Sequence, residues 1–300
     1  MADAHGADES DIVPGLTLRQ AVAAAGRELR AADIEDPMLD ARLLLAHAVG
    51  GDQLTLIRDG ERQLNPAEAG VFAALIAGRV ARKPVSRLLG RRAFWSLDLR
   101  LDASVLEPRP DSETAVTAAL EHLRDTDGAY HIADFGTGSG CLLLALLMER
   151  PRAFGVGVDI SPEAARIARR NADDLGLAAR AHFLAGNWGT AIAATGHLFD
   201  LIIANPPYIP TGDIPHLAPE VRNHDPHLAL DGGGDGMAAY RALLPDLKRL
   251  LKPGGQAVLE CGHDQAAALA ALYQKAGMHI AGVHQDLAGR DRCIRVSNEM

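Results

Sequence analysis

Cysteine, aromatic residues and long apolar runs are scarce in this sequence, and each shortage excludes a class of protein. Cysteine occurs three times, at Cys141, Cys261 and Cys293, which lie far apart and form no Cys-x-x-Cys pair, so we expect neither a disulfide framework nor a zinc site. Aromatic residues make up only 4% of the chain, so alanine and leucine must fill much of the core. No apolar run approaches the roughly 20 residues that cross a membrane, and the polar, acidic N-terminus is unlike a signal peptide. We therefore expect a globular protein of the reducing cytoplasm.

Basic residues are also in the minority, because 30 Lys and Arg against 39 Asp and Glu give a formal net charge of -9. This balance argues against a protein that holds nucleic acid by bulk charge, and we expect no sequence-specific nucleic-acid partner. Residues 79–100 are the exception, because seven basic side chains there face a single acid, Asp98. Two interpretations of this stretch remain open: a solvated helix face and loop, or a docking surface for an acidic macromolecule.

Two patterns of hydrophobic residues divide the chain. Between Leu16 and Leu89 apolar residues recur every three or four positions, and Asn65-Pro66-Ala67-Glu68 is a typical helix start because Asn65 can cap the helix and Glu68 can reach back to it. From Tyr130 onward, segments typical of strands and of helices alternate, which predicts a parallel sheet with crossover helices. We expect strands near 130–135, 154–159, 181–185, 199–204, 256–261, 279–284 and 292–297, and helices near 139–150, 162–176, 236–251 and 264–276.

The predicted fold class is α/β, with a Rossmann-like seven-stranded domain at 113–300 preceded by a small all-α bundle at 1–90. Residues 91–112 join the two as a strand or hairpin linker, because Phe94 to Leu99 alternate apolar and polar side chains. Residues 209–235 form a loop rich in Pro, His and Gly, and loops of this length in a compact domain usually cover a site.

The linker ends in a segment with two prolines. Because Pro108 and Pro110 flank Arg109, its backbone is stiff, and we expect its side chain to be placed and not loose. Asp111 is expected to cap the helix that follows.

Asn205-Pro206-Pro207-Tyr208 follows the apolar run Phe199–Ala204, which is typical of a buried parallel strand. The two prolines end the strand and hold the chain extended just beyond the carboxyl edge of the sheet, where open α/β sheets bind ligands. Here an amide side chain, free backbone carbonyls and one aromatic ring can hold a planar NH2 group. The alternative is a Pro-Pro turn that Asn205 caps.

Gly136-Thr137-Gly138-Ser139-Gly140 ends the first strand of the predicted sheet and begins a helix. Glycines let the backbone approach a ligand closely, and the N–H groups of the next helix favour a carboxylate or phosphate. The spacing is GxGxG, whereas the dinucleotide motif is GxGxxG. An NAD-linked oxidoreductase is therefore the least favoured function.

Two further strands end in polar or aromatic residues. Asp159 stands where a carboxylate meets the two hydroxyls of a ribose, although it could also belong to the start of the next helix. Asn187-Trp188 places an amide and a large ring where an adenine would lie, although Trp188 could equally pack in the core. Together with the glycine loop and Asn205 to Tyr208, these residues predict an S-adenosylmethionine site beside an amino-group acceptor.

These motifs resemble the protein-(glutamine-N5) methyltransferases of the HemK/PrmC type, which methylate the Gln of the Gly-Gly-Gln motif in peptide-chain release factors. The resemblance covers nearly the whole chain and rests on Phe94-Trp95-Ser96, Arg109-Pro110-Asp111-Ser112-Glu113, Gly136 to Gly140, Asp159, Asn187-Trp188, Asn205 to Tyr208 and Asp286-Leu287-Ala288-Gly289-Arg290-Asp291-Arg292. Asn-Pro-Pro-Tyr is shared with DNA adenine methyltransferases and a ribosomal-protein glutamine methyltransferase, whereas the Arg109 linker resembles the release-factor branch. One departure is His224-Asp225-Pro226, where the family usually has an aromatic-Glu-Pro step.

The resemblance implies S-adenosylmethionine as the cofactor, release factors as the protein partner, and substrate recognition by the N-terminal bundle. We expect Asn205, Pro206 and Tyr208 to be catalytic. Cofactor binding is expected from Gly136, Thr137, Gly138, Ser139, Gly140, Asp159, Trp188 and Asn205, and substrate binding from Asn205, Pro206, Pro207, Tyr208 and Arg109.

Several alternatives stay open. An adenine-N6 methyltransferase or a ribosomal-protein glutamine methyltransferase would use the same tetrapeptide, and a binding module that only senses S-adenosylmethionine would need the glycine loop alone. We expect no metal site, because the spacing of His216, His224, His227 and His263 fits no usual ligand pattern.

Overall fold

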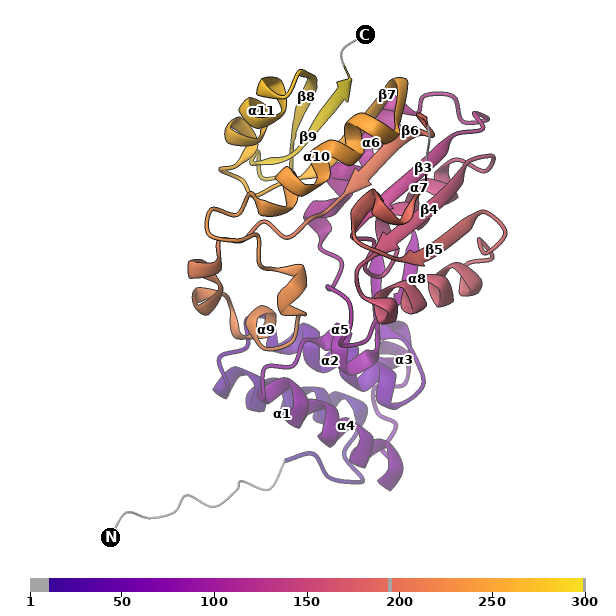
Figure 1. Ribbon diagram of the computed structural model, residues 1–300. Helices are drawn as coiled ribbons and strands as arrows, with labels where there is room; N and C mark the ends of the chain where they lie inside the picture. The colour runs from indigo at the N-terminus through magenta and orange to yellow at the C-terminus, as the bar shows by residue number, and fades with distance from the viewer. Residues whose placement is uncertain (1–10, 194–195, 299–300) are drawn as a thin grey trace. The chain divides into compact units, whose positions relative to one another are not determined.

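The computed structural model describes residues 11–193 and 196–298 (Figure 1). Its Cα positions divide the chain into two compact units, Met1–Gly90 and Arg91–Met300. Within the described ranges, no helix is both long enough and apolar enough to cross a membrane.

The first unit, described from residue 11, is an all-α bundle around its own apolar core, which confirms that part of the predicted fold. The predicted helix start is also confirmed: Glu68 donates its backbone N–H to the Asn65 side chain at 2.9 Å and accepts the Asn65 N–H at 3.0 Å. Leu44, Phe72 and Ile76 are fully buried at the centre of the bundle. The helices are α1 (Leu18–Ala31), α2 (Pro37–Ala48), α3 (Gln53–Arg58), α4 (Pro66–Val80) and α5 (Val85–Leu89).

The second unit begins with the antiparallel hairpin of β1 (Arg91–Phe94) and β2 (Leu97–Arg100), as the alternation of Phe94 to Leu99 predicted. Trp95 turns the chain with a positive φ of 54°, and its backbone N–H donates to Glu113 at 2.8 Å.

The expectation that Asp111 caps a helix is wrong. Pro110 starts a short 3-10 turn, η1 (Pro110–Ser112), so α6 (Glu113–His122) begins later and Ser112 occupies its N-cap position. The Asp111 carboxylate instead pairs with Arg292 at 3.0 Å.

All the predicted strands are present and form one seven-stranded sheet in the order β5-β4-β3-β6-β7-β9-β8, in which β9 is antiparallel to both neighbours. β3 and β6 are central, and the chain runs outward from β3 in one direction and from β6 in the other, so the topological switch point lies between them. The strands are β3 (His131–Phe135), β4 (Phe154–Asp159), β5 (Ala181–Ala185), β6 (Phe199–Ala204), β7 (Leu251–Glu260), β8 (Met278–Gln285) and β9 (Asp291–Asn298).

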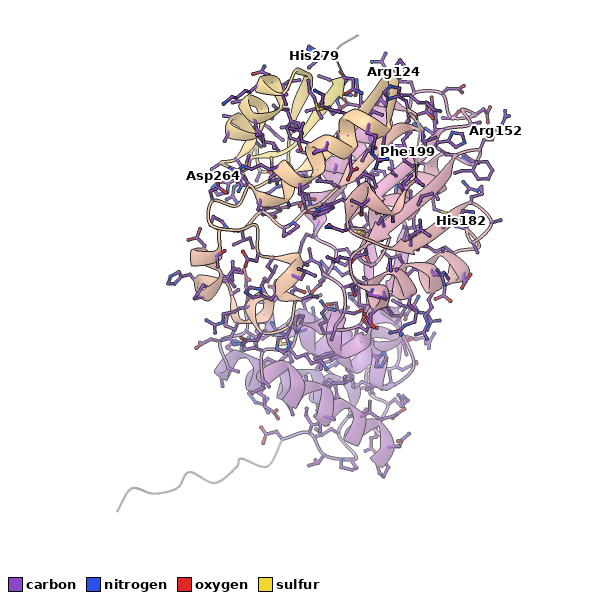
Figure 2. The ribbon with its side chains drawn as sticks, in the orientation of Figure 1. Arg124, Arg152, His182, Phe199, Asp264 and His279 are labelled. Atoms are coloured by element: carbon purple, nitrogen blue, oxygen red, sulfur yellow. The ribbon has the colours of Figure 1, made fainter. Side chains whose placement is uncertain are left out.

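Helices cover both faces of the sheet (Figure 1). One face packs against α6, α7 (Cys141–Glu149) and α8 (Pro162–Asp174). The other packs against α10 (Ala238–Leu250) and α11 (Ala266–Lys275). Side chains fill the space between the layers, among them that of Phe199 (Figure 2). This three-layer arrangement confirms the predicted Rossmann-like class.

One local prediction needs refinement. The expected loop 209–235 contains short turns, η3 (Thr211–His216), α9 (Pro219–Arg222) and η4 (His227–Ala229), and Ile209 forms a bridge to Asp231. Turns of three to six residues are too short to show a hydrophobic period.

Candidate active site

A cavity of about 590 Å³ opens at the carboxyl ends of β3, β4, β5 and β6, within the size range of roughly 300–1,000 Å³ of small-molecule sites. Residues after each of these strands line it, so it lies at the topological switch point of the sheet. Predicted residues in its lining are Arg109, Gly136, Thr137, Gly138, Ser139, Asp159, Trp188, Asn205 and Pro207.

The glycine loop turns sharply between β3 and α7. Gly136, Gly138 and Gly140 have φ of 75°, 55° and 81°, a region that residues with a Cβ rarely enter. Gly136 and Thr137 donate their N–H groups to the Val158 carbonyl at 2.8 and 3.1 Å. The loop is therefore held against the end of β4, and its residues Gly136 to Ser139 line the cavity.

Asp159 closes β4 and reaches back to the loop. Its Oδ2 accepts the Gly138 N–H at 2.8 Å and its Oδ1 accepts the Ser161 N–H at 2.9 Å. Burial raises the pKa of Asp159, and these two hydrogen bonds oppose the shift. Asp159 lines the cavity and each of its oxygens has a further lone pair, so the carboxylate can accept hydroxyl groups from a ligand.

Trp188 adopts a positive φ of 49° at the start of η2 (Trp188–Ala191). Its ring edge approaches Gly136 so closely that a Cβ there would lie 3.3 Å from Cζ3. Trp188 packs against the sheet core and also lines the cavity. Its contact with an adenine stays a prediction.

Two buried polar atoms beside the loop have no hydrogen-bond partner among the described residues, Ser139 Oγ and Asp134 Oδ1. Burial raises the pKa of Asp134 to about 7, against the opposing effect of the Thr137 hydroxyl, which donates to it at 2.7 Å. Polar atoms left unpaired at a glycine loop, together with Asp159 and the Trp188 ring, fit a ligand such as S-adenosylmethionine, which carries charged, hydroxyl and aromatic groups.

Asn205-Pro206-Pro207-Tyr208 lies directly after β6, at the edge where the sequence predicted it. Asn205 and Pro207 line the cavity, whereas Pro206 is buried and Tyr208 half-buried beside it. Asn205 Nδ2 donates to Ser112 Oγ at 3.2 Å, and the Tyr208 carbonyl accepts from Gln265 Nε2 at 2.9 Å. Neighbouring elements thus fix the tetrapeptide at both ends.

Arg109 lies on the cavity wall and is held from the other side of the site. Its Nη2 donates to Asp225 Oδ2 at 2.5 Å, and the Asp225 side chain is only 1% exposed. Asp225 belongs to the His-Asp-Pro step that departs from the usual aromatic-Glu-Pro. The carboxylate of this step therefore contacts Arg109.

Arg292 joins the linker segment to the closing motif, which lie far apart in the chain. It lies 2.8 Å from Asp286 in the closing motif and 3.0 Å from Asp111 in the linker. These ion pairs hold the linker segment and the closing motif together in the folded protein.

The basic residues of 79–100 mostly have carboxylate partners, which favours the structural interpretation of this stretch over a docking surface. Four of the seven form ion pairs, at 2.5 to 3.3 Å: Arg79 with Asp40, Arg91 with Asp98, Arg92 with Glu107 and Arg100 with Asp174.

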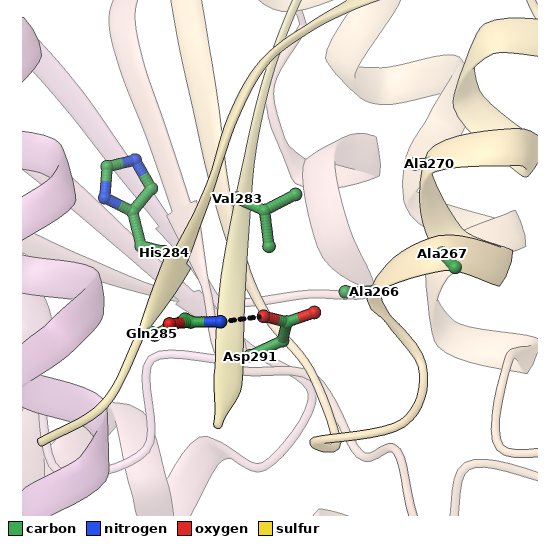
Figure 3. Close-up of a pocket in the computed structure, with 7 residues that line it drawn as sticks. All are labelled: Ala266, Ala267, Ala270, Val283, His284, Gln285 and Asp291. Atoms are coloured by element: carbon green, nitrogen blue, oxygen red, sulfur yellow. Dashed lines mark hydrogen bonds between the residues drawn. The ribbon is translucent and has the colours of Figure 1, made fainter. Parts of the chain in front are cut away.

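A second pocket, of about 500 Å³, lies between α11 and β8, where Gln285 donates to Asp291 at 3.0 Å (Figure 3). No residue predicted for the site lines it. Among the described residues, no three His, Cys, Asp or Glu side chains gather as a metal ion would need.

Comparison with known proteins identifies the family. The family model of the PrmC N-terminal domain matches residues 20–90, and that of a methyltransferase domain matches residues 126–289. The chain is 46% identical to the release factor glutamine methyltransferase of Rhodospirillum rubrum, over 96% of this chain and 86% of the relative. It is also 46% identical to that of Bradyrhizobium diazoefficiens, over 95% and 96%. The chain belongs to the release factor glutamine methyltransferase family.

This membership confirms the predicted family and enzyme class, and with the class the predicted methyl donor, S-adenosylmethionine. A solved methyltransferase from Pyrococcus furiosus, at 15% identity, shares the fold with a TM-score of 0.50 over 69% of this chain and 92% of its own.

Sequence reasoning missed two carboxylates near the site, Asp134 and Glu260, which are 1% exposed. Glu260 did carry a signal, because it is the one charged residue in the apolar run Ala257–Cys261 and stands at the carboxyl end of a predicted strand.

Proposed function

We propose that this protein transfers the methyl group of S-adenosylmethionine to the side-chain amide nitrogen, N5, of the Gln in the Gly-Gly-Gln motif of peptide-chain release factors. The observation that carries the proposal is the position of Asn205 on the wall of the same cavity as the glycine loop, Asp159 and Trp188. Support also comes from the curated relatives, which are named for this activity.

In this proposal the cofactor lies along the carboxyl edge of the sheet. Backbone groups of Gly136 to Gly140 hold its amino-acid end, Asp159 accepts its ribose hydroxyls, and the Trp188 ring packs against its adenine. Bound S-adenosylmethionine supplies a methyl group on a positively charged sulfur, which makes the carbon electrophilic.

The chain's own residues then place the acceptor. An amide nitrogen is a poor nucleophile because its lone pair is delocalised into the carbonyl. The Asn205 Oδ1 and the Pro206 carbonyl accept the two amide protons, and the Tyr208 ring packs on the amide plane. These acceptors stabilise the positive charge that develops on nitrogen, so they bind the transition state more tightly than the ground state.

The reaction balances without a strong base. The amide nitrogen, held at a near-attack distance of roughly 3–3.5 Å, would take the methyl group as the carbon–sulfur bond breaks with its electron pair on sulfur, and one nitrogen proton would leave to water. Arg109, held by Asp225, contacts the substrate backbone at the mouth. Residues 1–90 recognise the release factor, 91–112 link the parts, and 113–300 carry out the transfer in the cytoplasm.

A methyl-transfer assay with labelled S-adenosylmethionine tests the proposal. Purified release factor, its Gly-Gly-Gln→Gly-Gly-Ala variant and duplex DNA are offered in parallel. Label on the unmodified release factor alone is expected. Label on DNA, or on a ribosomal protein in lysate, would contradict the proposed substrate and favour the adenine-N6 or ribosomal-protein alternative.

A further inference from the structure

Glu260 is a buried carboxylate next to the proposed catalytic amide. It is the last residue of β7, and because Ala204 in β6 pairs with Leu259, Glu260 and Asn205 follow at the same level in adjacent parallel strands. Side chains alternate along a strand, so Glu260 faces the same side as Val258, toward the layer of α6. It is 1% exposed and does not line the cavity.

Ser112, at the start of α6, completes a cluster of three side chains. Its hydroxyl accepts from Asn205 Nδ2 at 3.2 Å, and Ser112 itself is 2% exposed. Both groups also lower the pKa of the Glu260 carboxylate, as donors close to it would. Oε2 of Glu260 has no hydrogen-bond partner among the described residues, so the carboxylate has acceptor capacity to spare.

We propose that Glu260 is a positioning residue that sets the rotation of the Asn205 amide, with Nδ2 turned toward Ser112 and Glu260 and Oδ1 turned toward the cavity. An ionised carboxylate can only accept hydrogen bonds, so it attracts the NH2 end of the amide and repels the oxygen end. With the amide reversed, its NH2 would face the NH2 group of the substrate, and two donors cannot pair. This inference rests on the proposed function. It assigns to Glu260 the orientation of Asn205 Oδ1, which accepts a proton of the substrate amide.

The charge on Glu260 decides whether the cluster works. Burial raises the pKa of Glu260 to about 7, Ser112, Arg292 and Asn205 lower it, and Asp111 raises it. A protonated Glu260 would donate and could hold Oδ1, which removes the preference for one rotation. The rate should therefore fall as the pH drops through about 7. Other titratable groups around it are Tyr208, Tyr240, Cys141, Cys261 and Cys293.

Glu260→Gln tests the proposal, because glutamine keeps the shape but can donate or accept and so no longer selects one rotation. In the methyl-transfer assay with release factor, we expect kcat to fall at least about twofold, because equal population of the two rotations halves the productive fraction, while the Kd of S-adenosylmethionine stays unchanged. The fall of kcat below pH 7 should also shrink relative to the wild type. The pKa of Asp134 is also raised to about 7, so Asp134 can change the rate in the same pH range. The role of Glu260 is therefore measured as the difference between the kcat–pH profiles of the wild type and Glu260→Gln.

Two further variants make the test specific. Asp200→Asn removes a carboxylate at the amino end of β6, where it pairs with Lys252 at 2.8 Å, and should keep the wild-type kcat and pH profile. Ser112→Ala removes the shared hydroxyl and should lower kcat. Both residues act through Asn205. The loss of kcat in the double variant Ser112→Ala/Glu260→Gln should therefore be smaller than the product of the losses in the two single variants.

The outcomes separate the inference from the function. A folded Glu260→Gln with wild-type kcat and pH profile, on a release factor that the wild type methylates, would overturn the role of Glu260 and leave the proposed function standing. Thermal melting shows whether Glu260→Gln folds. If it does not, two other measurements test the role of Glu260: the wild-type kcat as a function of pH, and the kcat of Ser112→Ala. A wild-type kcat that does not change through pH 7, or a Ser112→Ala variant with the wild-type kcat, would overturn the role. A wild type that labels no release factor overturns both proposals.

Discussion

At the residue scale, Asp159 holds the glycine loop and also faces the cavity. It accepts N–H groups from Gly138 and Ser161, so its removal affects both the ligand and the loop. Asp159→Ala should weaken S-adenosylmethionine binding by on the order of 1.5–3 kcal/mol. Asp159→Asn, which keeps one acceptor oxygen, should have a smaller effect.

Isothermal calorimetry measures both values. Asp173→Ala, which removes an exposed aspartate of the neighbouring helix α8, is the matched control and should bind as the wild type does. An unchanged affinity in Asp159→Ala would remove Asp159 from the cofactor site.

Individual site residues could be predicted from the sequence where they lie at or shortly after the end of a strand. Gly136, Asp159, Trp188 and Asn205 all do, and parallel strands bring their carboxyl ends to one edge. The partner of Arg109 could not be predicted, because Asp225 lies 116 residues further along and only the fold brings the two together.

At the element scale, the turn from β3 into α7 depends on close approach between Gly136 and Trp188. Gly136→Ala places a Cβ 3.3 Å from the Trp188 ring at a φ of 75°. Strain in this region lowers stability by about 1–2 kcal/mol, and we also expect S-adenosylmethionine affinity to fall at least about tenfold, or 1.4 kcal/mol.

Gly176→Ala is the matched control. It has a similar φ of 69°, but nothing lies within 4 Å of the added Cβ. Thermal melting should show a similar loss of stability in both variants, and calorimetry a loss of affinity in Gly136→Ala alone. Equal affinities would contradict the placement of Trp188 against the cofactor.

The elements themselves were largely predictable because buried parallel strands read as short apolar runs and helices begin at Ser-Pro or Asn-Pro steps. The start of α6 was mispredicted because Pro110 favours a 3-10 turn before the helix. Glu260 stayed hidden because its role depends on the register between β6 and β7 and not on its own neighbours in sequence.

At the scale of the whole molecule, the site is assembled from segments that are distant in the chain. The linker, the glycine loop, the tetrapeptide and the closing motif meet within the second unit through pairs such as Asn205 with Ser112 and Arg292 with Asp111. The cavity and the tetrapeptide lie at the same edge of the sheet. The sheet can therefore hold the methyl donor and the acceptor amide at a fixed distance from each other, which is catalysis by placement.

The most direct test of that claim compares Asn205→Ala with the wild type in two measurements, kcat for methyl transfer to release factor and Kd for S-adenosylmethionine. Asn223→Ala, in the 209–235 segment and outside the cavity lining, serves as the control. The account predicts that Asn205→Ala loses at least about a hundredfold in kcat while its Kd is nearly unchanged. An Asn205→Ala variant that keeps full turnover would contradict it.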